Sequence, residues 1–299
     1  MSSRGGLLKR GINRQRTLTS LLFIAPAAAL YGWLVLGSFA KAAQFSLYDW
    51  NGIGTATFVG LQNYVDVFSS PARLLSLLHA FELMVFFTGV TLILGLLAAV
   101  LTRGAAKRRG SGATRAILFM PQVIPIVAAA IGWSWIYSRE GAVNQILSAT
   151  GLGAITRPWL ADPGTALIAV GFIGTWALLG LVTLLLTAGI SKIDPALYEA
   201  VRIDGANPFQ EFFAVTLPGL RRELVVSATL TVIAALAAFD IIYITTQGGP
   251  ERATTVPGID IFFMAFGEQK VGGAAAMGIV LMAVVLVVIL PLQRLAAKD

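Results

Sequence analysis

Three side chains in the apolar part of the sequence have the chemistry to hold a polar solute: Asp240, Tyr243 and Trp176. Asp240 is the one ionisable residue deep within a predicted span, where a carboxylate is costly unless it faces a bundle interior or water. Tyr243 follows three residues later and shares its helical face. Together they offer hydrogen bonds and an apolar ring face. The alternative is that Asp240 bonds another helix or the Gly248-Gly249 turn and never meets a solute.

The sequence lacks the common motifs of nucleotide-binding and catalytic sites. No GxxxxGK[ST] phosphate loop, HExxH or GxSxG motif occurs, and cysteine is missing. The single histidine, His79, has no other metal ligands near it in sequence, so we interpret it as a side chain at the membrane interface. The sequence therefore predicts no catalytic residue, no metal site and no ATP bound by this chain.

Composition assigns the chain to the membrane. Of its 299 residues, 57% are hydrophobic and 12% are charged, against roughly 25% charged in ordinary soluble domains. The net charge of +7 does not indicate nucleic-acid binding, because the basic residues lie beside apolar segments and no aromatic residues alternate with them. Membrane lipid is the expected surrounding.

Uncharged apolar runs predict an all-α integral membrane protein with about six transmembrane helices, since crossing about 30 Å of hydrocarbon takes roughly 20 residues. Residues 1–16 form a basic tail, and residues 17–299 form a single transmembrane domain. The first run is too long for the core of a cleaved signal peptide. Residues 41–82 are expected to form an exposed loop. The predicted spans are 17–40, 83–102, 116–138, 166–190, 224–246 and 271–293.

A polar segment, 191–223, interrupts the apolar sequence between the fourth and fifth spans. Asp194-Pro195 is a helix-start signal, and the helix that it starts is expected to end near Asp204-Gly205. Asn207, Pro208 and Gln210 repeat the start signal as a capping box, and Leu217-Pro218 is expected to close the second helix. Two short helices hinged at Gly205 are therefore predicted.

The second of these helices has one apolar stripe. Phe209, Phe212, Phe213, Thr216 and Leu217 follow helical spacing and lie on the same face. The apolar side chains of such a stripe are expected to be buried against another surface. A partner protein is one possible cover, and the membrane surface or the chain's own bundle is the alternative.

The segment also resembles a known signature. Glu199-Ala200, Gly205 six positions after Glu199, and Leu217-Pro218 are similar to the EAA motif of ABC importer permeases of the carbohydrate-uptake type. The resemblance implies that the segment is a cytoplasmic coupling loop that docks into a cleft of a separate ATPase, with Glu199 making a charged contact across the joint. The residues implied in coupling are Glu199, Ala200, Asp204, Gly205, Pro208, Phe209, Phe212, Phe213, Leu217 and Pro218.

Three further phrases are similar to the same permeases: FVGLQNY at 58–64, MPQVIPIVAAAIGWSWIY at 120–137 and FDIIYITTQGGP at 239–250. The family implies a second homologous permease chain, two ATP-binding subunits that hold ATP and Mg, and an extracytoplasmic solute-binding protein. It implies alternating access for a sugar or sugar-like solute in a bacterial cytoplasmic (inner) membrane. An ion-coupled secondary transporter and an integral membrane enzyme are the alternatives from other classes.

The charge distribution predicts the orientation independently of any family. With both termini on one side, that side holds 16 of the 22 Lys and Arg residues, and the opposite side holds 6. Positively charged loops remain in the cytoplasm. Both termini and the segment 191–223 are therefore expected to face the cytoplasm, where ATP is available.

Overall fold

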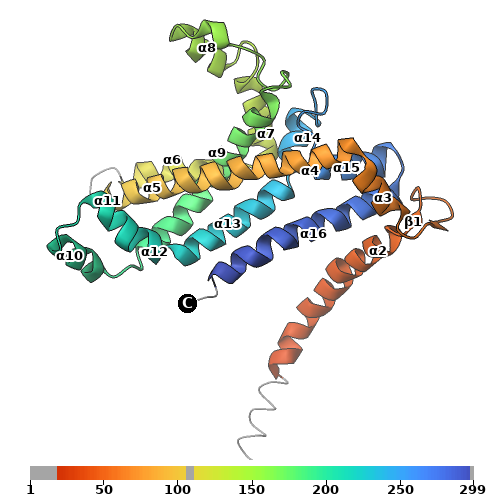
Figure 1. Cartoon of the computed structure of the whole chain (residues 1–299), viewed down its shortest axis with the longest axis horizontal. Coiled ribbons are helices and arrows are strands. Elements are labelled where there is room, and N and C mark those ends of the chain that lie inside the picture. Colours follow the sequence, from red (N-terminus) through yellow and green to blue (C-terminus); the bar gives the residue numbers. More distant parts are fainter. Residues whose placement is uncertain (1–18, 106–110, 297–299) are drawn as a thin grey trace, which may run out of the picture.

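The computed structural model describes residues 19–105 and 111–296, and most of them are helical (Figure 1). The first helix, Thr19–Phe45, includes a π-helical turn η1 (Gly32–Leu36) and α2 (Gly37–Phe45). This helix projects from the rest of the molecule, and its carboxyl-terminal part, α2, contacts α16. None of the residues in its apolar window is buried, so this helix contributes almost nothing to the core.

A small hairpin follows, with β1 (Tyr48–Asp49) antiparallel to β2 (Thr57–Phe58) and Tyr48 opposite Phe58. The chain continues as α3 (Gln62–Ser69), α4 (Pro71–Met84), the π-helical turn η2 (Val85–Val90) and α5 (Thr91–Ala105). Much of the loop expected at 41–82 is therefore helical. Proline in the first turn starts α4 at Pro71, so this helix begins well before Leu83.

The third expected span is sharply bent. The helix α6 (Ser111–Val123) ends at Ile124-Pro125, and α7 (Ile126–Ile136) leaves at 108°. Pro125 has no amide hydrogen to donate and restricts the residue before it, so the helix is broken there rather than gently kinked. Beyond α7 the chain forms α8 (Ala142–Ala149) and a short 3-10 turn η3 (Gly153–Ile155), which project away from the bundle in Figure 1.

The fourth helix, α9 (Ala166–Ile190), lies at the centre of the bundle, and its 25 residues cover the expected range. Glycines permit close packing: a Cβ at Gly174 would collide with the ring of Phe87. The hydroxyl of Thr175 donates to the carbonyl oxygen of Phe86, within η2, at 3.0 Å. Small residues and one interhelical hydrogen bond therefore hold α9 against the second helix.

The fifth expected span, 224–246, is not one helix. The helix α13 (Arg221–Leu236) stops, residues 237–239 are non-helical, and α14 (Asp240–Thr245) follows. Four helices in the described part of the chain are long and apolar enough to span a membrane, or five if the bent pair is one span. The divided fifth segment is the main difference from the six continuous spans that the sequence predicts.

The remaining elements cap the two ends of the bundle. At one end lie α10 (Pro195–Ile203), α11 (Pro208–Glu211), the π-helical turn η4 (Phe212–Thr216) and α12 (Leu217–Gly219). At the other end, beside α3 and the hairpin, lie α15 (Pro257–Phe262) and the π-helical turn η5 (Phe263–Gly267). The last helix, α16 (Val271–Ala296), runs back along the bundle.

Candidate functional site

The hinged pair of helices has the caps that the sequence predicts. The Asp194 side chain accepts from the backbone amide of Ala196 at 2.9 Å and begins α10. After α10 the chain turns at Gly205, whose φ of +84° lies in the left-handed region. No atom lies within 4 Å of where a Cβ would stand. Backbone conformation, rather than crowding, is therefore the reason for glycine here.

The capping box at the start of α11 is complete. The amide of Gln210 donates to Asn207 Oδ1 at 2.9 Å, and the amide of Asn207 donates to Gln210 Oε1 at 2.9 Å. Helical structure continues through η4 and α12 and ends at Gly219, one residue after the expected end at Leu217-Pro218. Proline at the first turn of α12 is compatible with that continuation, since π-helical geometry has already changed the bonding pattern before it.

An ion pair braces the joint between α10 and α11. Arg202 Nε donates to Glu211 Oε2 at 2.7 Å, and a second guanidinium nitrogen donates to Oε1 at 3.0 Å. The hydrogen bond and charge of Glu211 raise the pKa of Arg202 above its ordinary value, with a smaller contribution from the charge of Glu199. Within this chain, Arg202 and Glu211 make the charged contact between the two helices, and Glu199 is exposed.

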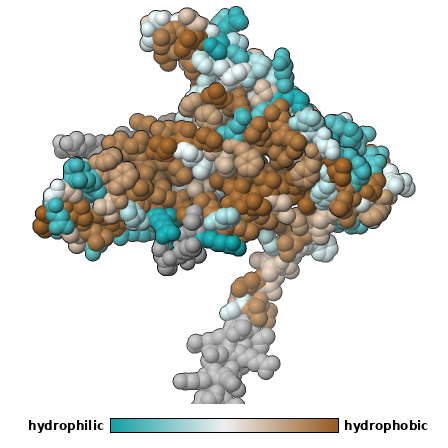
Figure 2. All heavy atoms as spheres, in the orientation of Figure 1, coloured by the Kyte–Doolittle hydropathy of each residue, from teal (hydrophilic) through white to brown (hydrophobic). Residues whose placement is uncertain are grey.

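The apolar stripe on this second helix divides into two parts. Thr216 is buried, and its hydroxyl lies 3.2 Å from that of Tyr198, so this end packs on α10. Phe209 is 72% exposed and Phe213 is 50% exposed, with ring centroids 4.8 Å apart. Apolar and polar side chains lie side by side at this end of the molecule (Figure 2). Two of the five stripe residues, Phe209 and Phe213, therefore remain exposed within this chain.

Most of the expected coupling residues lie on the surface. Phe212 and Leu217 are half-buried. The exposed ones are Glu199, Ala200, Asp204, Gly205, Pro208, Phe209, Phe213 and Pro218.

The base of this loop is attached firmly to α9 and α13. Leu220 is fully buried, and a Cβ at Gly189 would meet its side chain at 2.6 Å. Lys192, just after α9, pairs with Glu223 in α13 at 3.1 Å. A displacement of the hinged helices would therefore be passed directly to two long helices of the bundle.

Asp240 lies at the wall of a cavity of about 310 Å³ between η2, α7, α9 and the break in the fifth segment. It is the first residue of α14, and its side chain is exposed in this chain. The other lining residues are apolar or small, among them Phe87, Gly174, Ala177 and Ile233. A carboxylate on an otherwise apolar wall provides one strong hydrogen-bond acceptor for a solute.

The other two pathway candidates do not line this cavity. Tyr243 stacks on Phe239 with centroids 5.1 Å apart and packs edge-on against Phe262 at 4.9 Å. Trp176 packs edge-on against Trp133 at 5.6 Å. The structure therefore brings neither ring together with Asp240 at the cavity wall, and both rings already have aromatic neighbours.

Glu82 is an ionisable residue inside a long apolar helix that the sequence reading missed. It lies within the helix Pro71–Thr102 and is exposed, on a face with the exposed residues Leu75, Leu78 and Val85. The sequence reading placed it in a loop. The helix-start signal at Ser70-Pro71 was the clue to its true position.

His79 is buried rather than exposed at an interface. Its Nδ1 lies 2.9 Å from the carbonyl oxygen of Thr255, so that nitrogen carries the proton. Within residues 19–105 and 111–296, no group of three or more His, Cys, Asp or Glu is placed to hold a metal ion. His79 therefore ties α4 to the segment before α15.

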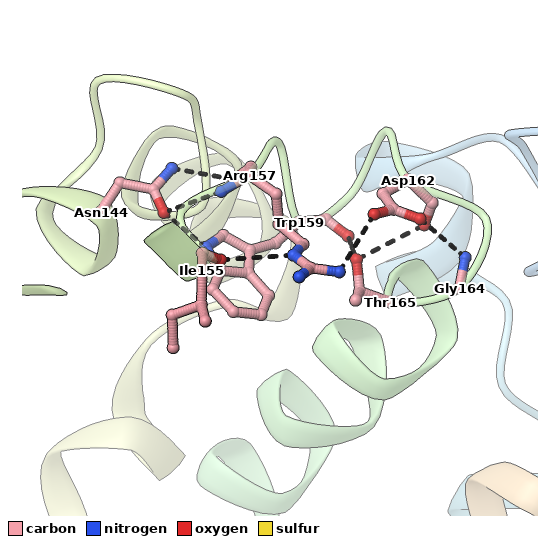
Figure 3. A network of polar contacts seen from close by, with 7 residues as sticks. All are labelled: Asn144, Ile155, Arg157, Trp159, Asp162, Gly164 and Thr165. Carbon is pink, nitrogen blue, oxygen red and sulfur yellow. Dashed lines mark hydrogen bonds and ion pairs between the residues drawn. The ribbon is translucent and has the colours of Figure 1, made fainter. Parts of the chain in front are cut away.

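The loop after α7 is more ordered than the outer loop expected there (Figure 3). The buried Asn144 side chain donates to the carbonyl oxygens of Ser138, Arg139 and Arg157. Its own oxygen accepts from Trp159 Nε1 at 2.8 Å. One amide therefore joins α8 to both ends of the loop.

Comparison with known proteins identifies the chain's family. Residues 91–298 match the binding-protein-dependent transport system inner membrane component family. The chain is 32% identical to the probable ABC transporter permease protein YurN of Bacillus subtilis, over 95% of this chain and 96% of that protein. It is 33% identical to the diacetylchitobiose uptake system permease protein NgcF of Streptomyces coelicolor, over 96% and 84%.

The fold also matches a solved structure. A chain of a bacterial alginate ABC transporter, in complex with an alginate pentasaccharide-bound periplasmic protein, aligns with a TM-score of 0.80 at 22% identity, over 96% of each chain. The braced loop, the broken helix beside a cavity and these matches lead to one conclusion: the chain belongs to the binding-protein-dependent transport system inner membrane component family, as a permease subunit of an ABC importer.

Proposed function

We propose that this chain forms half of the translocation pathway for a sugar or sugar-like solute and works by alternating access. ATP and Mg would be bound by two separate ATPase subunits, and both termini and the loop at 191–223 would face the cytoplasm. The relatives' names support the solute class, since one takes up diacetylchitobiose and another is a trehalose/maltose permease. The observation that carries the proposal is the braced α10–α11 pair with its uncovered phenylalanines.

The coupling step follows from the shape of that pair. Phe209 and Phe213 provide an apolar anchor for the ATPase, and Glu199 and Asp204 provide exposed charge beside it. Aromatic side chains that fill a partner's pocket contribute most to such contacts. Because caps and the Arg202–Glu211 ion pair make the two helices one unit, the unit transmits rigid-body motion to α9 and α13.

The pathway step uses the break in the fifth segment. Irregular backbone at membrane depth is tolerated where it lines a cavity, and residues 237–239 border the cavity that contains Asp240. The end of α13 leaves backbone carbonyl groups without helical partners. These carbonyls and the Asp240 carboxylate accept hydrogen bonds, which suits a solute that donates from several hydroxyl groups. Tyr243 and Trp176 would contribute only after their aromatic neighbours moved.

A second permease chain accounts for the exposed apolar arm. The helix Thr19–Phe45 exposes Phe23 at 83% and Trp33 at 82%, and it touches its own bundle only near its end. Lipid covers such a surface at no cost, but α7 projects apolar residues in a different direction, with Trp135 at 74% exposure. A homologous chain that packs along the Thr19–Phe45 helix would cover that surface.

The test is reconstitution of this chain in proteoliposomes together with the second permease chain, the ATPase subunits and the binding protein. We expect solute uptake that requires internal ATP and loaded binding protein and that persists when proton and sodium gradients are collapsed. Phe209→Ala/Phe213→Ala should lower ATP-driven uptake while the subunit remains in the membrane, and Val123→Ala, at another exposed apolar residue, is the matched control. Uptake driven by an ion gradient without ATP would contradict the proposal.

A further inference from the structure

We propose that a charged pocket at the hairpin end of the protein receives oppositely charged side chains of the solute-binding protein and orients that protein during docking. This inference rests on the proposed orientation, which puts the hairpin end outside. The pocket has a volume of about 250 Å³. Its wall comes from β1, α3, α4, η5 and the start of α16.

Charges of both signs line this pocket. Asp49 and Asp66 contribute carboxylates, and Arg73 and Lys270 contribute cations. Asp66 accepts a hydrogen bond from Gln62 Nε2 at 2.8 Å, and Lys270 pairs with the exposed Glu268 at 2.9 Å. Among the described residues, no ion pair within 4 Å joins any two of the four lining charges, so charge of both signs remains available to a partner.

The FVGLQNY phrase builds one side of the pocket. Val59, Gln62 and Asn63 are lining residues. Asn63 Nδ2 donates to the carbonyl oxygens of Ser46 and Tyr48, both at 2.9 Å, and so fixes the hairpin to α3. This hydrogen bonding is a structural reason for the asparagine in the phrase.

Two further contacts make the wall rigid. The hydroxyls of Ser46 and Tyr64 lie 2.7 Å apart. Gly272 packs so closely on the Tyr48 carbonyl that a Cβ there would collide with it. A pocket whose walls are fixed before binding loses little conformational entropy when a partner enters.

A protein side chain fits this pocket better than the transported solute does. No aromatic ring lines it, so it has no apolar platform for a sugar, and it shares no lining residue with the cavity at Asp240. The carboxylates and cations have fixed positions on a rigid wall, so they can pair with charged side chains that have fixed positions on a folded partner. Complementary charges chiefly determine orientation and association rate. The family's dependence on a binding protein supplies such a partner.

The experiment uses the complete transporter in lipid nanodiscs, titrated with loaded binding protein while ATP hydrolysis is measured. For Arg73→Glu and for Asp66→Arg we expect the half-saturating concentration of binding protein to rise about tenfold. Basal ATPase activity and the stimulated maximum should not change. Arg73→Gln and Asp66→Asn should give smaller shifts, which keeps the test valid if a reversal variant does not assemble. Added salt should raise the wild-type value more than the variant values.

Arg139→Glu is the matched control, because Arg139 is exposed on another loop and lies outside the pocket. It should leave the half-saturating concentration near the wild-type value. An equal shift in this control would overturn the inference, since it would indicate a general charge effect. A lower stimulated maximum with an unchanged half-saturating concentration would also overturn it, because the pocket would then act on the solute. If loaded binding protein did not stimulate ATP hydrolysis by the wild-type transporter, the proposed function itself would be overturned.

Discussion

Arg202 and Glu211 form a bidentate ion pair across the Gly205 turn, with nitrogen–oxygen distances of 2.7 and 3.0 Å. The pair joins the last turn of α10 to the first turn of α11. Both residues lie where helix dipoles favour them, a cation near a carboxyl end and an anion near an amino end. The contact therefore fixes the angle between the two helices that carry the exposed phenylalanines.

Arg202→Ala should uncouple ATP hydrolysis from uptake without unfolding the subunit. Exposed ion pairs contribute little to stability because water and salt screen them, so membrane levels should be close to wild type. The angle between α10 and α11 should become variable, and less motion would reach α9. The measurement is ATP hydrolysed per solute transported, which should rise. The exchange variant Arg202→Glu/Glu211→Arg should restore part of the coupling, and a fully inactive exchange variant would argue against the brace.

Substitutions at Gly205 should reduce coupling in a graded order. Because its φ is +84° and the space around it is open, a side chain there costs backbone energy only. That cost is about 1–2 kcal/mol for ordinary L-residues and less for asparagine. Uptake should therefore fall in the order glycine, Gly205→Asn, Gly205→Ala, Gly205→Pro. Equal uptake from all four proteins would show that the turn needs no left-handed residue.

The sequence predicted the local structure of this loop well because its signals are local. Asp194, Asn207 and Gln210 satisfy free amides within a few residues of themselves, and all three hydrogen bonds are present. The Arg202–Glu211 contact was not predicted. It depends on the angle at Gly205, and nothing in the local spacing of residues determines that angle.

The break in the fifth segment shows where sequence reading fails in a membrane chain. Residues 224–246 are uninterrupted by proline, and apolarity alone predicts one helix. The structure instead ends α13 at Leu236 and begins α14 at Asp240. Phe239 packs against Tyr243, four residues later, and against Phe262 in α15. The second of these contacts joins segments that are separate in sequence.

Asp240→Asn should lower the maximal uptake rate at saturating loaded binding protein. A hydrogen bond to a charged group contributes about 1.5–3 kcal/mol, so the loss should be about tenfold or more. Glu82→Gln is the matched control, because Glu82 does not line the cavity that contains Asp240. Rates are compared per assembled transporter. An equal loss in both variants, or none in Asp240→Asn, would remove Asp240 from the pathway.

Asn144→Ala should loosen the projecting loop while leaving the bundle intact. Asn144 is buried, and its amide makes hydrogen bonds that join Ser138, Arg157 and Trp159. Removal leaves buried partners unsatisfied, at about 1–3 kcal/mol for each group that water cannot reach. Hydrogen exchange should therefore speed up at 138–165 and remain unchanged in α9. Thr150→Ala is the control, since the Thr150 hydroxyl bonds only within its own helix. Faster exchange throughout α9 would mean that the loop supports the bundle, whereas unchanged exchange at 138–165 would mean that Asn144 does not hold the loop.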